Sequence, residues 1–426
     1  MELKDKKVLV AGSGKSGIAA TDLLKKVGAT VTIYDGNEKL VKEDILSRLE
    51  DNSNVNVVLG DLSDEVINDT DLMILSPGIA IDAPFVNKVR DAEVPIWGEV
   101  ELAYIVGKGK LAAITGTNGK TTTTALVGEI LSAYFKDVNV VGNIGTPYTC
   151  TAFDSTDDTV TVAEISSFQL ETIHRFKPDV SAVLNITPDH LNRHYTMECY
   201  TDVKMSICKN QDSDAPIILN YEDEILRNYA PKLHNKIIWF SSRQTLDEGI
   251  YLEGKNIVYA QKGQKNVITT TEDTTLVGIH NIENIMAAIG ITINMGVPVD
   301  VIKEAIRKFK AVEHRIEYVK TVDDVLYYND SKGTNTDASI KAIQAMTRPT
   351  VLIAGGYDKK IPFEPMAETV NEKVKALILM GLTAPKIEKA ITEAANYNPE
   401  NIKIYHADSM ENAVEIAKEI STNGDI

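Results

Sequence analysis

Short apolar runs alternate with amphipathic stretches along most of the 426-residue chain. In the first part this pattern predicts a helix at 16–27 and strands at 8–11, 30–35, 55–59 and 72–75. Strands that alternate with helices are typical of a parallel sheet with helices on both faces. The pattern restarts near residues 94–98, so we predict a first domain at residues 1–97.

The second part of the chain combines this alternation with a section of different character. Its apolar runs predict strands at 111–115, 159–165, 180–186, 217–220 and 237–240. Between residues 249 and 277, short alternating runs with Gly and Asn turns indicate antiparallel strands. Helices predicted at 280–295 and 300–309 complete a second domain, which we place at residues 98–311.

The third part returns to the first pattern, and we predict a third domain at residues 312–426. Its strands are expected at 325–329, 351–354, 376–379 and 402–405, with helices between them. After a helix at 410–420 and a turn, Asp425 and Ile426 are interpreted as the first step of another strand. A parallel sheet without its last strand leaves an unpaired edge. We therefore expect the natural chain to continue past residue 426.

Composition and charge narrow the class of protein. Hydrophobic residues make up 43% and charged residues 25%, as in ordinary globular proteins, and the length suggests about three domains. The net charge of −17 argues against general binding to nucleic acid or to membrane surfaces, which needs clustered Lys and Arg. An anionic ligand must instead be held by glycine loops and helix N-termini.

The cysteines and the N-terminal residues bear on the compartment. Cys150, Cys199 and Cys208 form no CxxC pair, which favours a reducing compartment. The N-terminus passes from charged residues into a short apolar run without a secretory pattern. No run of 18 apolar residues occurs, so we expect no membrane insertion and a cytoplasmic location.

A glycine-rich segment at residues 115–122 carries the strongest chemical signal. It follows a predicted strand and precedes a predicted helix, the setting in which backbone N–H groups cradle phosphate. The candidate nucleotide-binding residues are Gly116, Thr117, Asn118, Gly119, Lys120, Thr121 and Thr122. Ile114 stands where the longer Walker pattern has glycine, so this is a shorter relative of that loop. A glycine-rich turn without nucleotide is the alternative.

A second glycine loop follows the first predicted strand. Gly12, Ser13, Gly14, Lys15, Ser16 and Gly17 have the G-x-G-x-x-G spacing, and Asp35 ends the next strand. Such a loop accommodates a diphosphate, which NAD and a UDP-sugar both contain. Ser76 and Gly78 form another turn that faces a ligand after the strand at 72–75. Tight turns with no ligand remain an alternative for both segments.

Polar side chains follow several other predicted strands. Glu164 ends a strand where α/β ligands bind, and a carboxylate suits Mg²⁺. His190 lies over the same crevice, and Lys204 is on a helix further on. Taken singly, a histidine is usually structural and a helix lysine is usually solvated.

The third domain has its own polar loops at the strand ends. Residues 314–317 read HRIE, residues 329–335 read NDSKGTN, and residues 355–359 read GGYDK. Lys332 and Lys359 are basic groups able to hold carboxylates. Ordinary loop residues are the alternative.

Together these segments resemble the Mur ligase family of ATP-dependent peptidoglycan precursor synthetases over nearly the whole chain. The motifs are, in order, GTNGKTT, GNIG, EISSFQLE, NITPDHLNRH, HNIEN, HRIE, NDSKGTN and GGYDK. Within the family, NDSK and the N-terminal VLVAGSGKSGIAA are similar to the members that add D-glutamate. The resemblance implies an α/β fold of three domains. These are a Rossmann-like N-terminal sheet, a central P-loop ATPase-like domain with a small antiparallel section, and a C-terminal Rossmann-like domain, here without its last strand.

The resemblance also implies a reaction and its partners. ATP phosphorylates the carboxylate of UDP-N-acetylmuramoyl-L-alanine, and the amine of D-glutamate attacks the resulting acyl phosphate. Two Mg²⁺ ions, a Lys204 carbamylated by CO₂, and a monomeric enzyme are expected with it. Family members continue past a turn like that at 423–425 into a serine-containing loop that holds D-glutamate, so turnover by a chain ending at 426 is in question.

The family roles transfer to matching positions. Lys120 would contact the transferring phosphoryl group, Thr121 and Glu164 would hold one Mg²⁺, and His190 would hold a second. Asn143 would contact phosphate or acyl substrate, and residues 12–17, 35 and 76–78 would hold the UDP moiety. The residues placed around ATP are Asn281, Asn284, Arg315 and Asp330. Those facing the acyl substrate and D-glutamate are Lys332, Thr334 and Lys359.

Three other hypotheses remain at this stage. Another amide ligase, such as folylpolyglutamate synthase, would lack the N-terminal glycine loop. An NAD-dependent dehydrogenase would leave the phosphate loop and the third domain without a role. A truncated, non-catalytic form that binds UDP-sugar and ATP is the third.

Overall fold

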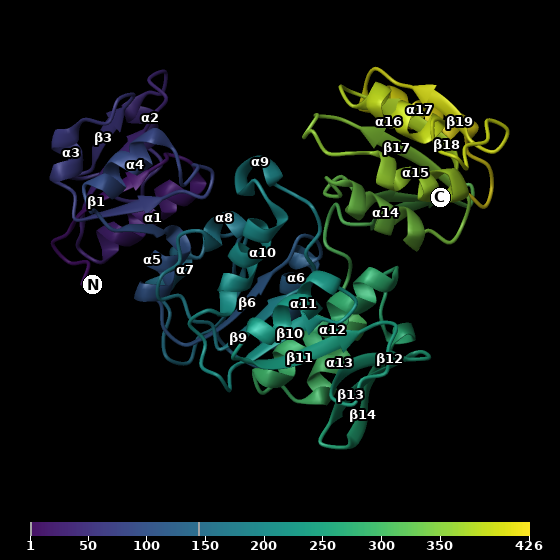
Figure 1. The fold of residues 1–426 in the computed structure, drawn as a ribbon, viewed down its shortest axis with the longest axis horizontal. Helices are drawn as coiled ribbons and strands as arrows, with labels where there is room; N and C mark the ends of the chain where they lie inside the picture. Colours follow the sequence, from purple (N-terminus) through teal and green to yellow (C-terminus); the bar gives the residue numbers. More distant parts are fainter. Residues whose placement is uncertain (1, 144) are drawn as a thin grey trace. The chain divides into compact units, whose positions relative to one another are not determined.

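The computed structural model describes residues 2–143 and 145–426. Figure 1 labels its helices and strands, and the chain divides into two compact units. The first unit contains Met1–Thr269 and Met286–Ile306, and the second contains Thr270–Ile285 and Arg307–Ile426. None of the helices in this described part is long and apolar enough to cross a membrane.

The first unit begins with a five-stranded parallel sheet of order β3-β2-β1-β4-β5. The strands are β1 (Lys7–Ala11), β2 (Thr30–Asp35), β3 (Asn56–Leu59), β4 (Leu72–Leu75) and β5 (Ile96–Gly98). The helices are α1 (Lys15–Lys26), α2 (Lys42–Leu46), α3 (Asp64–Asn68) and α4 (Pro84–Asp91). The four strands predicted from the sequence are confirmed, and the three-residue β5 was missed. The chain order reverses between β1 and β4, where open α/β sheets bind ligands.

A nine-stranded sheet follows, of order β14-β13-β12-β11-β10-β9-β6-β8-β7. Its strands are β6 (Lys110–Thr115), β7 (Val138–Gly142), β8 (Val160–Glu164), β9 (Val180–Val183), β10 (Pro216–Asn220), β11 (Lys236–Ser241), β12 (Gly249–Glu253), β13 (Asn256–Gln261) and β14 (Gln264–Thr270). Strands β6 to β12 pair in parallel, whereas β12 and β13 pair antiparallel. The predicted antiparallel section is therefore confirmed, as an extension of the parallel sheet.

Many short helices connect these strands. They are α5 (Glu99–Val106), α6 (Lys120–Ser132), α7 (Thr149–Ala152), α8 (Ser167–Leu170), α9 (Leu191–His194), α10 (Met197–Met205), η1 (Ser206–Cys208), α11 (Glu224–Tyr229) and η2 (Ala230–Lys232). The short helix η3 (Thr271–Asp273) follows the last strand and belongs to the second unit. The helices α12 (Ile279–Asn294) and α13 (Val299–Lys308) confirm the predicted pair.

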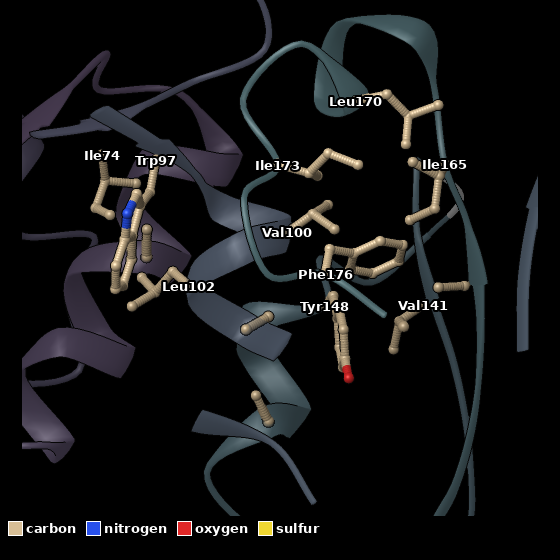
Figure 2. Packing of buried hydrophobic residues seen from close by; sticks show 14 of the residues in the cluster. Ile74, Trp97, Val100, Leu102, Val141, Tyr148, Ile165, Leu170, Ile173 and Phe176 are labelled. Atoms are coloured by element: carbon tan, nitrogen blue, oxygen red, sulfur yellow. The ribbon is translucent and has the colours of Figure 1, made fainter. Parts of the chain in front are cut away.

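One hydrophobic core joins the two sheets of the first unit. Ile74 and Trp97 come from the first sheet, and Phe176 and Ile165 belong to the nine-stranded sheet and its loops; Figure 2 shows them on either side of α5. Buried Glu101 on α5 accepts hydrogen bonds from three successive backbone N–H groups at residues 174–176, at 2.7–3.0 Å. The core and this carboxylate fix the first sheet on the second.

The second unit contains two separate sheets. β15 (Glu317–Val322) and β16 (Val325–Asn329) form an antiparallel pair, and β17 (Thr350–Gly355), β18 (Val374–Met380) and β19 (Lys403–His406) form a parallel sheet. The helices are α14 (Thr336–Ala345), α15 (Glu364–Lys373), α16 (Ala384–Thr392) and α17 (Met410–Ile420). The sequence did not predict β15. Asp323 and Asp324, both with positive φ, close a two-residue hairpin turn from β15 into β16.

Asp425 and Ile426, which were expected to begin a further strand, form backbone hydrogen bonds with both sheets of the second unit. The Leu326 N–H of β16 donates to the Asp425 carbonyl at 2.9 Å, and the Val351 N–H of β17 donates to the Ile426 carbonyl at 2.7 Å. The Ile426 N–H donates in turn to the Pro349 carbonyl at 3.0 Å. This is the bonding of a strand position between β16 and β17.

Candidate active site

The phosphate loop connects β6 to α6. Gly116 and Gly119 have φ of 151° and 86°, which only glycine adopts readily, so the loop can turn sharply into the helix N-terminus. The Lys120 ammonium donates to the carbonyls of Gly116 and Thr117, both at 2.9 Å. Asn185, after β9, holds Asn118 by a hydrogen bond in each direction, at 2.8 and 3.0 Å. Hydrogen bonds within the loop and from the residue that follows β9 therefore fix the conformation of the loop.

Lys204 on α10 lies directly behind this loop. It is 2% exposed, and its Nζ donates to the Gly116 carbonyl at 2.8 Å. The interpretation of Lys204 as a solvated helix lysine is therefore wrong. Burial, followed by the charge of Lys120, lowers the pKa of Lys204 well below its ordinary value, against the attraction of Asp189 and Glu164. A neutral amine is favoured at this position.

Tyr200, one turn before Lys204, was not singled out from the sequence. Its hydroxyl lies 3.1 Å from the Thr117 hydroxyl, and its ring centroid lies 4.8 Å from Lys204 Nζ. An aromatic residue four positions before a helix lysine is too common a pattern to mark a site.

Glu164 ends β8 next to the phosphate loop. It is 2% exposed, and its Oε1 accepts a hydrogen bond from Asn143 Nδ2 at 3.0 Å. Its Oε2 is buried with no hydrogen-bond partner among residues 2–143 and 145–426. A buried carboxylate oxygen without a donor beside a phosphate loop fits a hard cation such as Mg²⁺.

No group of three or more His, Cys, Asp or Glu side chains within the described ranges is arranged to hold a metal. Magnesium at nucleotide sites usually takes one or two carboxylates, a hydroxyl, water and substrate phosphates. Thr121 and Glu164 supply a hydroxyl and a carboxylate of this kind, so the residues fit Mg²⁺.

His190 follows β9 and has an unusual backbone. Its φ is 54°, and its Nε2 lies 3.6 Å from Asp189 Oδ2. The ring packs edge-on against Phe168, with centroids 4.8 Å apart. The side chain is 42% exposed, so a ligand can reach it.

The first glycine loop lines a cavity of about 550 Å³. The sequence-predicted residues in its wall are Gly12, Ser13, Gly14, Lys15, Ser16, Asp35, Ser76 and Gly78, and Tyr34, Asn37, Pro77 and Phe85 are among the others. Gly17 is not in the wall. It packs against the Gly12 carbonyl, which a Cβ at residue 17 would approach to 1.8 Å.

Asp35 lines this cavity and holds its glycine loop through hydrogen bonds. Its Oδ2 accepts from the Ser13 N–H at 3.0 Å and the Ser13 hydroxyl at 2.6 Å, and its Oδ1 accepts from the Asn37 N–H at 3.1 Å. Burial raises the pKa of Asp35, but these hydrogen bonds outweigh it and leave the pKa lowered. The carboxylate thus holds the loop that would meet a diphosphate.

The remaining candidates belong to the second unit. Asp330 Oδ1 accepts from the Ile316 N–H at 3.0 Å, and the Lys332 N–H donates to the His314 carbonyl at 3.1 Å. This brings the HRIE and NDSKGTN segments, with Arg315, side by side. Burial raises the pKa of Asp330. Asn281 and Asn284 are buried together at the start of α12, whereas Lys332, Thr334 and Lys359 are exposed.

Comparison with known proteins matches three consecutive parts of the chain to one family. The MurD-like N-terminal domain of Mur ligases matches residues 6–98, the Mur ligase middle domain matches 114–292, and the Mur ligase glutamate ligase domain matches 314–426. The chain belongs to the Mur ligase family. These matches argue against a dehydrogenase, because all three parts of the chain are accounted for.

Two similar proteins have the same name, which specifies a reaction. A UDP-N-acetylmuramoylalanine–D-glutamate ligase of Lachnospira eligens is 49% identical over 425 residues, which is 100% of this chain and 93% of that protein. The ligase of the same name from Lachnoclostridium phytofermentans is 50% identical, covering 98% of this chain and 91% of that protein.

Solved structures support the fold. MurF ligase of Thermotoga maritima, in complex with ADP, aligns with a TM-score of 0.61 at 18% identity, covering 100% of this chain and 90% of that one. MurC of the same organism aligns with a TM-score of 0.59 at 18% identity, covering 98% and 94%.

Proposed function

We propose that this chain adds D-glutamate to UDP-N-acetylmuramoyl-L-alanine, with ATP as the energy source, in peptidoglycan precursor synthesis. Relatives named for that reaction share about half of its residues along its whole length. The observation that carries the proposal is the buried group behind the phosphate loop. There, the buried Lys204 amine donates to the Gly116 carbonyl of the phosphate loop, and Glu164 Oε2 is buried without a hydrogen-bond partner in the described ranges, which supports a phosphoryl-transfer site.

The residues divide the work of an acyl-phosphate mechanism. The cavity at residues 12–16 holds the UDP end of the acyl substrate, and the N-terminus of α6 and Lys120 hold the ATP phosphates. The substrate carboxylate attacks the γ-phosphorus of ATP, and ADP leaves. The D-glutamate nitrogen then attacks the acyl carbon, loses a proton, and phosphate leaves.

Thr121, Glu164, His190 and a carbamylated Lys204 would hold two Mg²⁺ ions. When bound, magnesium neutralises charge on the phosphate oxygens. Asn143 keeps Glu164 in place through its hydrogen bond to Oε1. We assign it in addition to contact with phosphate or the acyl substrate.

Carbamylation of Lys204 suits the site. The neutral amine adds CO₂ to form a carbamate and releases one proton, so a buried neutral group becomes an anion. Burial of Lys204 favours the neutral nucleophile, and Lys120 and magnesium favour the anionic product. The modification therefore places an anion, and not a second ammonium, beside Lys120.

The second unit carries the remaining candidate residues. We assign Asn281, Asn284, Arg315 and Asp330 to ATP, and Lys332, Thr334 and Lys359 to the acyl substrate and D-glutamate. Three domains, at residues 1–97, 98–311 and 312–426, a monomeric state and a cytoplasmic location belong to the same proposal.

Phosphate release from ATP tests the function directly. It is measured with UDP-N-acetylmuramoyl-L-alanine present, with and without D-glutamate, on this chain and on one extended past residue 426. We expect release that depends on both substrates and an amide product of matching amount. Binding of UDP-substrate and ATP without release from either chain would instead identify a non-catalytic binding protein.

A further inference from the structure

Arg193 on α9 reaches from the metal-binding segment to the UDP-substrate cavity. Its Nη1 donates to the Pro77 carbonyl at 3.1 Å, and Pro77 lines the cavity. Its Nε and Nη2 donate to the two carboxylate oxygens of Glu171, at 3.3 and 2.5 Å. The side chains of Arg193 and Glu171 are only 13% and 7% exposed, so this pair is shielded from water.

Phe168 connects the same arginine to His190. The Arg193 guanidinium lies 4.5 Å from the Phe168 ring centroid, a cation–π contact, and the His190 ring lies 4.8 Å from that centroid. One aromatic ring therefore supports both the proposed Mg²⁺ ligand and the arginine that holds the cavity loop. We call Pro77, Arg193, Glu171 and Phe168 the Arg193 bridge.

His194 also lies beside Glu171, but it does not supply the positive charge that pairs with this carboxylate. Its Nε2 lies 2.9 Å from the Ser167 hydroxyl, and its Nδ1 lies 3.5 Å from Glu171 Oε1. Burial, followed by the charge of Arg193, lowers the pKa of His194 to about 4. The cation paired with Glu171 is therefore Arg193.

The proposed reaction makes the bridge useful. The acyl substrate is held at its UDP end by the first sheet, while its carboxylate must meet the phosphoryl group over the second sheet. Reacting atoms must come within about 3–3.5 Å, and a misplacement of about 1 Å can cost about a hundredfold in rate. A planar guanidinium can bind a carboxylate with two N–H groups and a carbonyl with a third, which an ammonium cannot do in that geometry.

We propose that Arg193 is a positioning residue that sets the distance between the UDP-substrate loop at residues 76–78 and the phosphoryl-transfer site at His190. This inference rests on the proposed ligase function. It assigns Arg193 no contact with the reacting atoms; Arg193 acts through Pro77, Glu171 and Phe168.

Tyr195 provides a matched control. Its hydroxyl donates to Asp82 Oδ2 at 2.6 Å, so it also joins the segment after His190 to the loop after β4. Tyr195 is 69% exposed, and this bond competes with water. Tyr195→Phe removes a link between the same segments without touching the Arg193 bridge.

The kinetic test compares Arg193→Ala, Arg193→Lys, Glu171→Gln and Tyr195→Phe. For Arg193→Ala we expect kcat to fall about a hundredfold, while the calorimetric Kd values for ATP and UDP-N-acetylmuramoyl-L-alanine change less than about threefold. Arg193→Lys and Glu171→Gln, which keep most of the volume, should lose kcat at least about tenfold, and Tyr195→Phe should stay within about twofold. A kcat near that of wild type in folded Arg193→Lys and Glu171→Gln would overturn the proposal. So would a loss explained entirely by weaker UDP-substrate binding.

A second measurement separates this inference from the ligase function. Amide hydrogen exchange at residues 76–82 should rise in Arg193→Ala and not in Tyr195→Phe, whether or not the wild-type chain forms an amide. Unchanged exchange in Arg193→Ala would show that the bridge does not hold the loop. An inactive wild type with the expected exchange would refute the ligase function and leave the bridge in place.

Discussion

The Lys204 amine lies where an unmodified, protonated lysine is costly. It is buried, it has the Gly116 carbonyl as acceptor, and the Lys120 ammonium donates to the same carbonyl. Two like charges in a dry site repel strongly. The proposed conversion of Lys204 into a carbamate would remove this repulsion and would supply a ligand for magnesium.

Substitution of Lys204 tests this chemistry. Lys204→Ala should lose nearly all ligase activity, and added formate or acetate should restore part of it, because a small carboxylate can occupy the vacated space beside the proposed magnesium site. Lys204→Arg should stay inactive, since arginine cannot become an anion. Activity is measured as D-glutamate-dependent phosphate release from a chain extended past residue 426.

Lys209 is the control for this substitution. Burial also lowers its pKa, and its Nζ donates to the Ile173 carbonyl at 2.6 Å, away from the phosphate loop. Lys209→Ala should retain activity and show no response to formate. Wild-type activity in Lys204→Arg would show that Lys204 has no anionic role.

Ser13 is predicted to control the ionisation of Asp35. Because the folded-state pKa of Asp35 is lowered, its hydrogen bonds stabilise the fold above the unfolded pKa of about 3.9, and this stabilisation is lost as pH falls through the folded value. Ser13→Ala removes the 2.6 Å bond and should raise the pKa of Asp35. The difference in unfolding free energy between wild type and Ser13→Ala should be largest above about pH 4 and shrink below it.

Urea unfolding between about pH 2 and pH 7 measures this difference. Ser16→Ala is the control, since Ser16 lines the same cavity but does not bond to Asp35. A difference that is constant over the whole range would mean that Asp35 does not carry the effect.

The close packing of helix α1 against the loop after β1 allows another test. A Cβ at Gly17 would lie 1.8 Å from the Gly12 carbonyl oxygen, which is backbone and cannot turn away. Gly17→Ala should therefore lower the unfolding free energy by about 1–3 kcal/mol or more and weaken UDP-substrate binding. Gly14 has open space and a φ of −72°, so Gly14→Ala should be nearly neutral for stability in the same urea titration. Equal stability of the two variants would contradict the close packing of α1 on this loop.

Strand burial explains which strands the sequence could predict. Val8–Val10 and Leu72–Leu75 lie in fully buried parallel strands, so their apolar runs were visible. β7 and β15 were missed because most of their residues are exposed or only half-buried, as the mixed patterns VNVVG and EYVKTV indicate. An edge strand or hairpin strand held by backbone bonds needs no continuous apolar run.

The candidate site was predictable only in part, because some of its contacts join residues that are far apart in the sequence. Glu164 and the phosphate loop follow neighbouring strands of one sheet, so strand order alone brings them together. Arg193 and Pro77 are 116 residues apart and belong to different sheets. Their contact depends on how the shared core of the two sheets packs. No local sequence pattern indicates that packing. The burial of Lys204 was hidden in the same way, because charged residues are interspersed with the apolar residues of α10, so its sequence shows no clear buried face.

Along the chain as a whole, the two glycine loops belong to two different sheets of the first unit. The loop at residues 12–17 follows β1, and the loop at residues 116–119 follows β6. If each binds one ligand, a change in one loop should leave the affinity for the other ligand almost intact. Independent sites separated by a rigid core usually behave additively.

Lys120→Ala and Lys15→Ala test this separation in opposite directions. Lys120→Ala should abolish phosphate release and weaken ATP binding, while the calorimetric Kd for UDP-N-acetylmuramoyl-L-alanine changes less than about twofold. Lys15 lines the UDP-substrate cavity and donates to the Gly145 carbonyl, so Lys15→Ala should weaken UDP-substrate binding and leave ATP binding unchanged. Circular dichroism confirms that each variant is folded, since Lys120 also supports its own loop through Gly116 and Thr117. Phosphate release at the wild-type rate in folded Lys120→Ala would refute the phosphate-loop assignment, and equal loss of both ligands in either variant would refute separate sites.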